Sequence, residues 1–206
     1  MSFIYRDFDL LDQKEQGKLL KGSIVPRPIA WITTSNEDNL INLAPFSYFN
    51  MVNSSTVMVS FRRFGSRKKD TANNILLKKE AVINIADDTL IKELDDSSIE
   101  LDSNVSELTL NSLNLINSTK VSVPGILEAP IKLEVILLNH LELMNYDNSV
   151  VESDLMILRV VGASFNDEVI DQDKNYVLLD KLNPISRLGG PDYGKTILDK
   201  KYKRNF

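Results

Sequence analysis

A strict alternation of apolar and polar residues is the feature that most constrains the fold of this chain. Val57, Val59 and Phe61 occupy every second position of residues 56–62, and residues 131–137 begin a similar pattern. Successive side chains of a β-strand point to opposite faces, so a period of two indicates strands. Further strands are predicted at residues 28–34, 81–86 and 155–164. Five or six strands with few helices between them predict a mainly β protein, a small antiparallel barrel rather than a parallel βαβ sheet.

The 206 residues suffice for one domain with its own core, so we expect a single domain spanning residues 1–206. One helix is predicted from Asp70 or Thr71, either of which can cap it, to about Lys79. Residues 87–115 are acidic and rich in Ser, Asn and Leu, which predicts helices and loops on the surface, and the carboxylates from Asp87 to Glu107 are expected to form a solvated acidic face.

Composition excludes several kinds of chemistry. The chain has no cysteine and one histidine, His140, which rules out disulfides, thiolate catalysis, iron–sulfur clusters and sites rich in Cys or His. His140 has no identifiable partner and is expected to be a structural or surface residue, and we predict no metal site. The net charge of -5 argues against nucleic acid or an anionic membrane as a partner.

The N-terminal residues 1–16 are charged and contain no apolar core of the kind found in signal peptides. No stretch approaches the roughly 18 apolar residues needed to span a bilayer. These features predict a cytoplasmic protein without a membrane partner.

A basic loop is the sharpest local feature. Five cations fall within eight residues and lead directly into the predicted helix: Arg62, Arg63, Arg67, Lys68 and Lys69. The first N–H groups of a helix lack partners and lie at the positive end of its dipole, so cations and a hydroxyl placed there favour an anion such as a phosphate monoester. The alternative is a solvated basic turn with an ordinary cap at Asp70.

Residues 42–47 form a second feature, because Pro45 cannot donate a hydrogen bond to a neighbouring strand. The segment should therefore be a sheet edge or a bend, with backbone N–H groups free to meet a ligand. Asn42 and Ser47 flank it with small polar side chains. A plain edge strand without a ligand is the alternative.

Residues 189–196 match the pattern of a phosphate-binding P-loop, Gly-x-x-x-x-Gly-Lys-Thr. That pattern binds nucleotide only between a buried strand and a long helix of an α/β sheet. Neither is expected here, and ten residues follow Thr196. We therefore predict that the match is accidental and that the protein is not a nucleoside triphosphatase.

Several ordered motifs resemble the flavin reductase-like family, which includes flavoredoxins. The resemblance extends from about Gly22 to Tyr193. It rests on residues 26–34, on residues 42–49, on Lys69-Asp70-Thr71 with Asn74-Ile75, on residues 128–134 and on residues 187–193. It implies an FMN-binding split barrel: a Greek-key antiparallel β-barrel with a few flanking helices that forms a homodimer, with flavin near the subunit interface.

The resemblance also implies roles for individual residues. Lys69 and Thr71 would bind the FMN phosphate, and Asp70 would cap the helix. The isoalloxazine ring and ribityl chain would meet Thr33, Thr34 and the segment from Asn42 to Ser47. The full set of implied cofactor-binding residues is Arg27, Thr33, Thr34, Asn42, Ala44, Pro45, Phe46, Ser47, Ser60, Arg62, Lys69, Asp70 and Thr71.

The resemblance also implies less direct roles. Arg187 and Tyr193 would border the site. The basic loop is longer than the family's usual version, which would let Arg62 or Arg63 hold a nicotinamide phosphate.

The function implied is an FMN-binding oxidoreductase in which NADH or NADPH reduces the flavin. Reduced flavin would then serve an acceptor, a partner monooxygenase or an electron-transfer protein. Hydride chemistry belongs to the cofactor, so no catalytic residue is assigned. The alternatives are an electron carrier of the flavoredoxin type with little nicotinamide activity and a non-catalytic ligand-binding split barrel, in which His140 would be the only strong nitrogen ligand for a haem.

Overall fold

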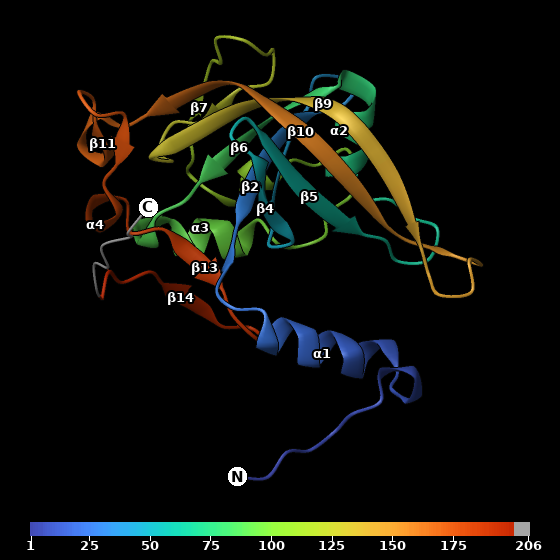
Figure 1. Ribbon diagram of the computed structural model, residues 1–206. Coiled ribbons are helices and arrows are strands. Elements are labelled where there is room, and N and C mark those ends of the chain that lie inside the picture. Colours follow the sequence, from blue (N-terminus) through green and yellow to red (C-terminus); the bar gives the residue numbers. More distant parts are fainter. Residues whose placement is uncertain (200–206) are drawn as a thin grey trace.

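Seven strands of the computed structural model, which describes residues 1–199, form one antiparallel sheet in the order β3-β2-β6-β9-β10-β5-β4. Figure 1 shows this sheet curled into an incomplete barrel. The edge strands β3 and β4 follow one another in the chain, separated only by Ser47 and Tyr48. The strands are β2 (Ala30–Ser35), β3 (Ile41–Phe46), β4 (Phe49–Asn53), β5 (Thr56–Arg62), β6 (Glu80–Ile85), β9 (Ile131–Met144) and β10 (Val151–Phe165).

The barrel interior confirms the period-two prediction. Val57, Val59 and Phe61 of β5 are all buried in one apolar core. Helix α2 (Asp70–Lys78) adds Ala72 and Ile75 to the same core. Because α2 packs against this core, the start of this helix and the basic loop before it are held beside the barrel.

A second core lies on the other side of β2. Trp31 is fully buried there with Leu90 and Leu94, which come from η2 (Asp88–Leu90) and α3 (Ile91–Asp96). The Trp31 indole N–H donates to the hydroxyl of Ser97 at 2.8 Å. The predicted surface character of residues 87–115 is therefore wrong for the buried residues of this segment, which are Leu90, Leu94, Ser97, Ser106 and Glu107.

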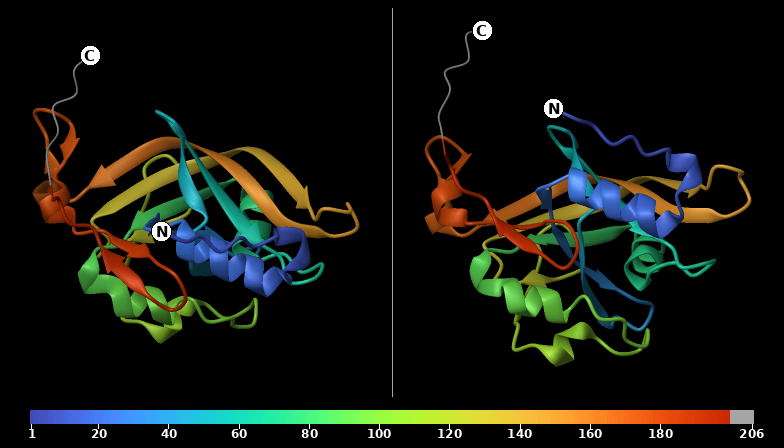
Figure 2. Two further views of the ribbon diagram at one scale, coloured as in Figure 1. Left: turned by 60° about the horizontal axis from the view of Figure 1, so that its bottom comes forward. Right: turned by 90° about the horizontal axis from the view of Figure 1, so that it is seen from below.

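Helix α1 (Gln13–Ser23) was not among the predicted elements. Asp12 and Glu15 form a reciprocal capping box at its start, a local signal that the sequence carries. No residue of α1 is buried. Figures 1 and 2 show the helix lying apart from the barrel, and its last turn is held by β1 (Arg27–Pro28), through hydrogen bonds from Arg27 to the carbonyls of Lys21 and Ile24.

Smaller elements complete the described chain. β1, β13 (Ile185–Arg187) and β14 (Tyr193–Lys195) form a separate three-stranded sheet. The remaining elements are η1 (Phe8–Leu10), η3 (Glu107–Leu110), β7 (Leu115–Ile116), β8 (Gly125–Ile126), η4 (Asp167–Val169), β11 (Ile170–Asp171), β12 (Tyr176–Val177) and α4 (Leu179–Leu182). None of the helices within residues 1–199 has the length and apolar character needed to cross a membrane. The last seven residues of the predicted domain, 200–206, lie outside the described part.

Two local predictions can be compared with the backbone. The P-loop-like residues form the turn and second strand of the β13–β14 hairpin, and Lys195 lies in that strand rather than at the start of a helix, which is not the arrangement that a P-loop requires. The cap prediction is wrong, since Lys69 is the N-cap of α2 and no side chain caps this helix. Asp70 instead occupies the first helical position, where its charge faces the positive end of the dipole.

The Trp31–Ser97 hydrogen bond generates a stability prediction. Ser97→Ala leaves a buried indole N–H without a partner, and we expect a loss of about 1–3 kcal/mol in the free energy of unfolding. Urea denaturation measures this loss. The matched control is Ser98→Ala, because Ser98 is exposed and should change stability little. Equal stability of the two variants would show that the bond does not hold the second core to β2.

Candidate functional site

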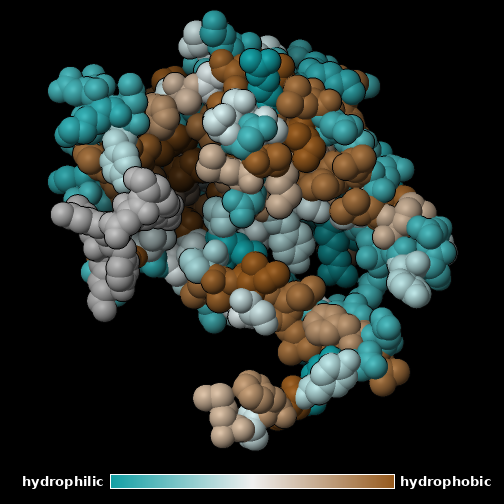
Figure 3. Space-filling model, in the orientation of Figure 1, coloured by the Kyte–Doolittle hydropathy of each residue, from teal (hydrophilic) through white to brown (hydrophobic). Residues whose placement is uncertain are grey.

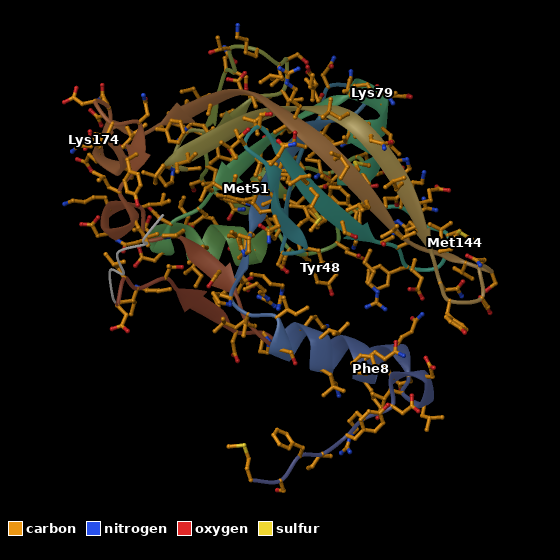
Figure 4. The ribbon with its side chains drawn as sticks, in the orientation of Figure 1. Phe8, Tyr48, Met51, Lys79, Met144 and Lys174 are labelled. Carbon is orange, nitrogen blue, oxygen red and sulfur yellow. The ribbon has the colours of Figure 1, made fainter. Side chains whose placement is uncertain are left out.

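A cavity of about 450 Å³ opens at the barrel rim, where β3, β5, the basic loop and residues 97–101 meet. Figure 3 shows hydrophilic atoms gathered in the hollow between the barrel and α1. Tyr48, in the link between β3 and β4, lies on the side of the barrel that faces α1 (Figure 4). The cavity is thus bounded by the sheet edge on one side and by helical and loop segments on the other.

Most residues implied by the family resemblance line this one cavity. They are Arg27, Asn42, Ala44, Pro45, Phe46, Ser47, Ser60, Arg62, Lys69, Asp70 and Thr71. Arg187 lines it too, whereas Tyr193 lies beneath the Arg187 guanidinium with its ring centroid 4.3 Å away. Residues distant in sequence are therefore brought together as expected.

Thr33 and Thr34 do not line the cavity. Both are fully buried within β2. The Thr33 hydroxyl donates to the carbonyl of Pro124 at 2.7 Å, and the Thr34 hydroxyl accepts from the Asn74 amide at 3.1 Å. Their place is inside the fold, where Thr34 ties β2 to α2, and the expected contact with a ligand is not supported by their positions.

The charge of the cavity is opposite to that of the whole protein. Seven basic residues line it against three acidic ones, Asp70, Glu100 and Glu107, although the chain has a net charge of -5. The basic residues are Lys21, Arg27, Arg62, Arg67, Lys68, Lys69 and Arg187. A concave surface lined by one sign of charge concentrates ions of the other sign, so the natural occupant is anionic.

The start of α2 presents several hydrogen-bond donors and a cation that could hold an anion at one end of the cavity. Thr71 is 2% exposed and its hydroxyl oxygen accepts from the Asn42 amide at 2.9 Å, which leaves the hydroxyl hydrogen free to donate. Lys69 forms an ion pair with the exposed Glu100, and its ammonium lies 4.8 Å from the Phe64 ring centroid. The Lys69 ammonium lowers the pKa of Glu100. With no side-chain cap on α2, its first N–H groups add further donors.

The basic loop is anchored by a buried carboxylate. Asp154 has a fully buried side chain and accepts from Arg63 at 2.7 and 2.6 Å. Burial opposes ionisation of Asp154, but hydrogen bonds from Arg63 and His140 together hold its pKa below the usual range. Hydrogen bonding to Asp154 raises the pKa of Arg63 in turn. Arg63 therefore holds the loop in place and does not line this cavity, whereas Arg62, the alternative residue expected to hold a nicotinamide phosphate, does line it.

His140 has a partner that the sequence did not reveal. Its Nε2 atom lies 2.7 Å from an oxygen of Asp154. The ligand atoms of His140, Glu142 and Asp154 all lie within 4.8 Å of one another, a spacing that a metal ion could use. However, Arg63 and Lys68 form ion pairs with both carboxylates, so their negative charge is already neutralised by side chains.

Glu107 belongs to the site and not to a solvated face, which corrects the expectation for its segment. It is 7% exposed and accepts the backbone N–H of Leu43 in β3 at 2.9 Å. Burial raises its pKa, while the hydrogen bond from Leu43 partly opposes that effect. Glu107 thereby fastens η3 to the edge strand that borders the cavity.

Sequence reasoning missed the lining residues from two segments. Lys21 comes from α1, whose capping box at Asp12 and Glu15 was the available signal. Residues 97–101 come from the acidic segment, where no local pattern distinguishes them from a surface loop. Their position follows from Trp31, which binds Ser97 across the second core.

The fold and the cavity define the class of protein. The mainly β, open antiparallel barrel has the fold of a solved split-barrel protein from Shewanella frigidimarina, with a TM-score of 0.81 at 16% identity. Residues 22–181 match the flavin reductase like domain, and the chain belongs to this family.

Individual relatives agree with this placement. The chain is 40% identical over 189 residues to the uncharacterized protein YwrF of Bacillus subtilis, covering 91% of this chain and 92% of that protein. Nitrilotriacetate monooxygenase component B from Bacillus cereus has a similar structure, with a TM-score of 0.91, 33% identity and coverage of 99% and 100% of the two chains. The 2-nitrobenzoate 2-nitroreductase NbaA from Pseudomonas fluorescens gives a TM-score of 0.88 at 27% identity, covering 98% and 96%.

The Asp154 anchor generates a prediction on stability and pH. Asp154→Asn leaves the positive charge of Arg63 without its main counter-charge, and we expect the free energy of unfolding to fall by about 3 kcal/mol at pH 7. Because the pKa of Asp154 is lowered in the folded protein, its contribution is complete above the unfolded pKa of about 3.9 and is lost as pH falls through the folded value. Urea denaturation from pH 7 to pH 3 should show a smaller acid-dependent loss for Asp154→Asn than for the wild type.

The exposed Asp173 provides the matched control for this measurement. Asp173→Asn should leave both the stability and its pH dependence close to those of the wild type. Parallel acid profiles for wild type and Asp154→Asn would contradict the anchoring role.

Proposed function

We propose that this protein is an oxidoreductase that binds FMN in the rim cavity and passes electrons from NADH or NADPH through it to an acceptor. One observation carries the proposal. The start of α2, with Lys69 and Thr71, opens into the same cavity as the unpaired edge of β3, so a phosphate site and a site for a planar polar ring are continuous.

The residues present fit FMN. Lys69, the Thr71 hydroxyl and the free N–H groups of α2 would hold the phosphate. The edge formed by Ala44, Pro45 and Phe46 would meet the isoalloxazine through backbone groups that pair with no neighbouring strand on that side. The volume of about 450 Å³ lies within the usual range for cofactor sites.

Bound FMN would supply the hydride-accepting chemistry, and the chain's own residues would bind, orient and shield it. Phe46 packs against Phe61 of the barrel core with ring centroids 4.6 Å apart, which fixes the edge strand beside the ring site. Glu107 holds the same strand from the other side through Leu43. Residues 97–101 and α1 border the opening and limit the access of water.

Two relatives support a redox role and indicate two kinds of acceptor. One is named as component B of a monooxygenase and the other as a nitroreductase. A partner monooxygenase supplied with reduced flavin and a small nitroaromatic acceptor are therefore both compatible with this fold. The proposal includes a cytoplasmic location, where NADH and NADPH are present.

A homodimer is part of the same proposal. Exposed apolar side chains on β4 and the far half of β9 would otherwise remain in contact with water: Met51, Val52, Leu141, Leu143 and Met144. Met51 and Met144 are labelled well apart in Figure 4, so these side chains belong to separate exposed regions of the sheet. Burial of such apolar regions by a second copy is the usual way to remove them from solvent.

Light scattering on the purified protein tests the dimer. We expect twice the mass of one chain, and Met51→Lys combined with Val52→Lys should give the monomer because two charges would enter the interface. Tyr176→Lys on the small β11–β12 sheet is the control and should remain dimeric. A monomeric wild type would contradict this part of the proposal.

An absorption spectrum tests the central claim. The purified protein, or the protein after addition of FMN, should show a bound flavin that bleaches when NADH or NADPH is added without oxygen. Bleaching identifies the donor, and a bound flavin that neither donor reduces would favour a carrier that takes electrons from another protein. If FMN does not bind at all, the proposed function is wrong.

A double variant at the start of α2 tests where the FMN phosphate binds. Lys69→Ala combined with Thr71→Ala should weaken FMN binding at least tenfold, or by about 1.4 kcal/mol, because a charge-assisted phosphate contact is lost. Quenching of flavin fluorescence measures the affinity. Lys78→Ala at the other end of α2 is the control, and unchanged affinity in the double variant would place the phosphate elsewhere.

A further inference from the structure

Two arginines stand directly opposite each other at the side of the cavity formed by β1 and β13. The antiparallel pairing of these strands places Arg27 beside Arg187. Residues directly opposite in such a pair share a face with Cβ atoms about 5 Å apart, and like charges there are destabilising. Both arginines line the cavity, and neither forms an ion pair with a carboxylate of residues 1–199.

Arg27 is a buried charge with neutral partners. It is 7% exposed, and its guanidinium donates to the carbonyls of Lys21 and Ile24 at 2.7 Å and of Leu188 at 2.8 Å. Its Nε atom is buried and has no hydrogen-bond partner in the described chain. Carbonyl groups satisfy hydrogen bonds but do not neutralise a full charge, so this site retains an unbalanced positive charge.

Arg187 is held in place without being neutralised. Its guanidinium lies 4.3 Å from the Tyr193 ring centroid and donates to the carbonyl of Gly190 at 3.1 Å. The Tyr193 hydroxyl donates to Asp95 at 2.7 Å, and burial together with this bond raises the pKa of Tyr193 to about 12. The ring therefore stays neutral and fixed beneath Arg187, which presents a pre-positioned planar cation.

A third cation joins the pair from α1. Lys21 lines the same cavity, and no ion pair engages it within residues 1–199. The turn after β13 approaches α1 closely at Gly189, where a Cβ atom would lie 3.3 Å from the Cα atom of Gly22. Glycine at this position thus lets the end of α1 lie against the arginine pair.

These three cations are separate from the FMN phosphate end. They come from α1, β1 and β13, whereas the phosphate end is formed by α2 and the basic loop. Figures 1 and 2 both show β13 and α2 well apart in the molecule. One phosphate monoester at α2 therefore leaves Lys21, Arg27 and Arg187 without a counter-ion.

From these observations we propose that Lys21, Arg27 and Arg187 form a second anion site that binds an oxyanion of the substrate that exchanges electrons with the flavin. This proposal rests on the proposed function, because it places the flavin phosphate at α2. A guanidinium binds a phosphate or a carboxylate through two parallel hydrogen bonds, and both kinds of oxyanion relieve the repulsion of the pair. The phosphate would come from the diphosphate of the nicotinamide donor, and the carboxylate from an aromatic acid acceptor.

The test uses the FMN-loaded protein, in which the α2 end is filled. Binding of inorganic pyrophosphate and of benzoate is measured by calorimetry for the wild type, Arg187→Gln and Lys21→Gln. We expect Arg187→Gln to weaken the binding of at least one of these anions tenfold or more, with FMN affinity unchanged within twofold. Lys18→Gln, on an exposed position of α1, is the matched control and should bind like the wild type.

The pattern of loss identifies the source of the oxyanion. Loss of pyrophosphate binding together with a raised KM for NADH or NADPH at unchanged kcat supports the donor. Loss of benzoate binding, with benzamide binding to neither protein, supports an acidic acceptor. A purely structural role for Arg187 would lower stability and leave both affinities unaltered, whereas we expect the ligand-free Arg187→Gln variant to be at least as stable as the wild type.

Two results would overturn the proposal. One is unchanged affinity for both anions in Arg187→Gln and Lys21→Gln. The other is a tenfold loss of FMN affinity in Arg187→Gln, which would place the flavin phosphate at the arginine pair. If the wild type binds no FMN, the proposed function fails by itself, and the same titrations on flavin-free protein still decide whether Lys21, Arg27 and Arg187 bind an oxyanion.

Discussion

The arrangement of this protein depends on a strand that is buried on both faces. Every residue of β2 is buried, with Ile32 in the barrel core and Trp31 in the second core. A strand covered on one face alone would leave Trp31 in solvent. Because both faces of β2 are covered, the segment after β6 must pass over β2 and β3. The hydrogen bond between Trp31 and Ser97 fixes the position of the residue that follows α3. Residues 97–101 then reach the rim and form one wall of the cavity.

The fold also gathers basic side chains at the rim cavity, where few acidic side chains lie nearby. The rim brings together three parts of the chain that are far apart in sequence: the end of α1 with the adjacent β1, the basic loop, and β13. Repulsion among these groups lowers the stability of the empty site, and a ligand that binds only the folded protein recovers it. If the proposed ligands bind here, their affinity and the stability of this rim are linked, which would account for arginines that form no ion pair within residues 1–199.

The barrel and much of its rim could be predicted from sequence because each depends on local patterns. Alternation at Val57, Val59 and Phe61 and the run of cations before α2 required no knowledge of distant contacts. Sequence reasoning failed where a contact with a distant residue determines the position of a side chain. Glu107 resembles a surface acid in sequence but accepts the backbone N–H of Leu43. Thr33 and Thr34 are buried and form hydrogen bonds with Pro124 and Asn74.

The basic loop shows why a charge pattern does not by itself assign roles. Arg63 and Lys68 face Asp154 and Glu142, which come from a hairpin about eighty residues away in the chain, so these two cations hold the loop in place. Arg67 lies 3.9 Å from Asp70, and both groups are partly exposed, so the charge of Arg67 remains largely available.

Lys69 pairs with Glu100 in the ligand-free protein, so Glu100 and the proposed phosphate would compete for the same ammonium group. Its partner Glu100 has a side chain that is 61% exposed, and such pairs contribute little to stability because water solvates both charges well. A phosphate carries more charge than the carboxylate, and at the proposed site it would also accept from the Thr71 hydroxyl and the N–H groups of α2. Exchange of Glu100 for a phosphate would therefore cost little and form several bonds, whereas the same exchange at the buried Asp154 would leave an uncompensated charge inside the fold.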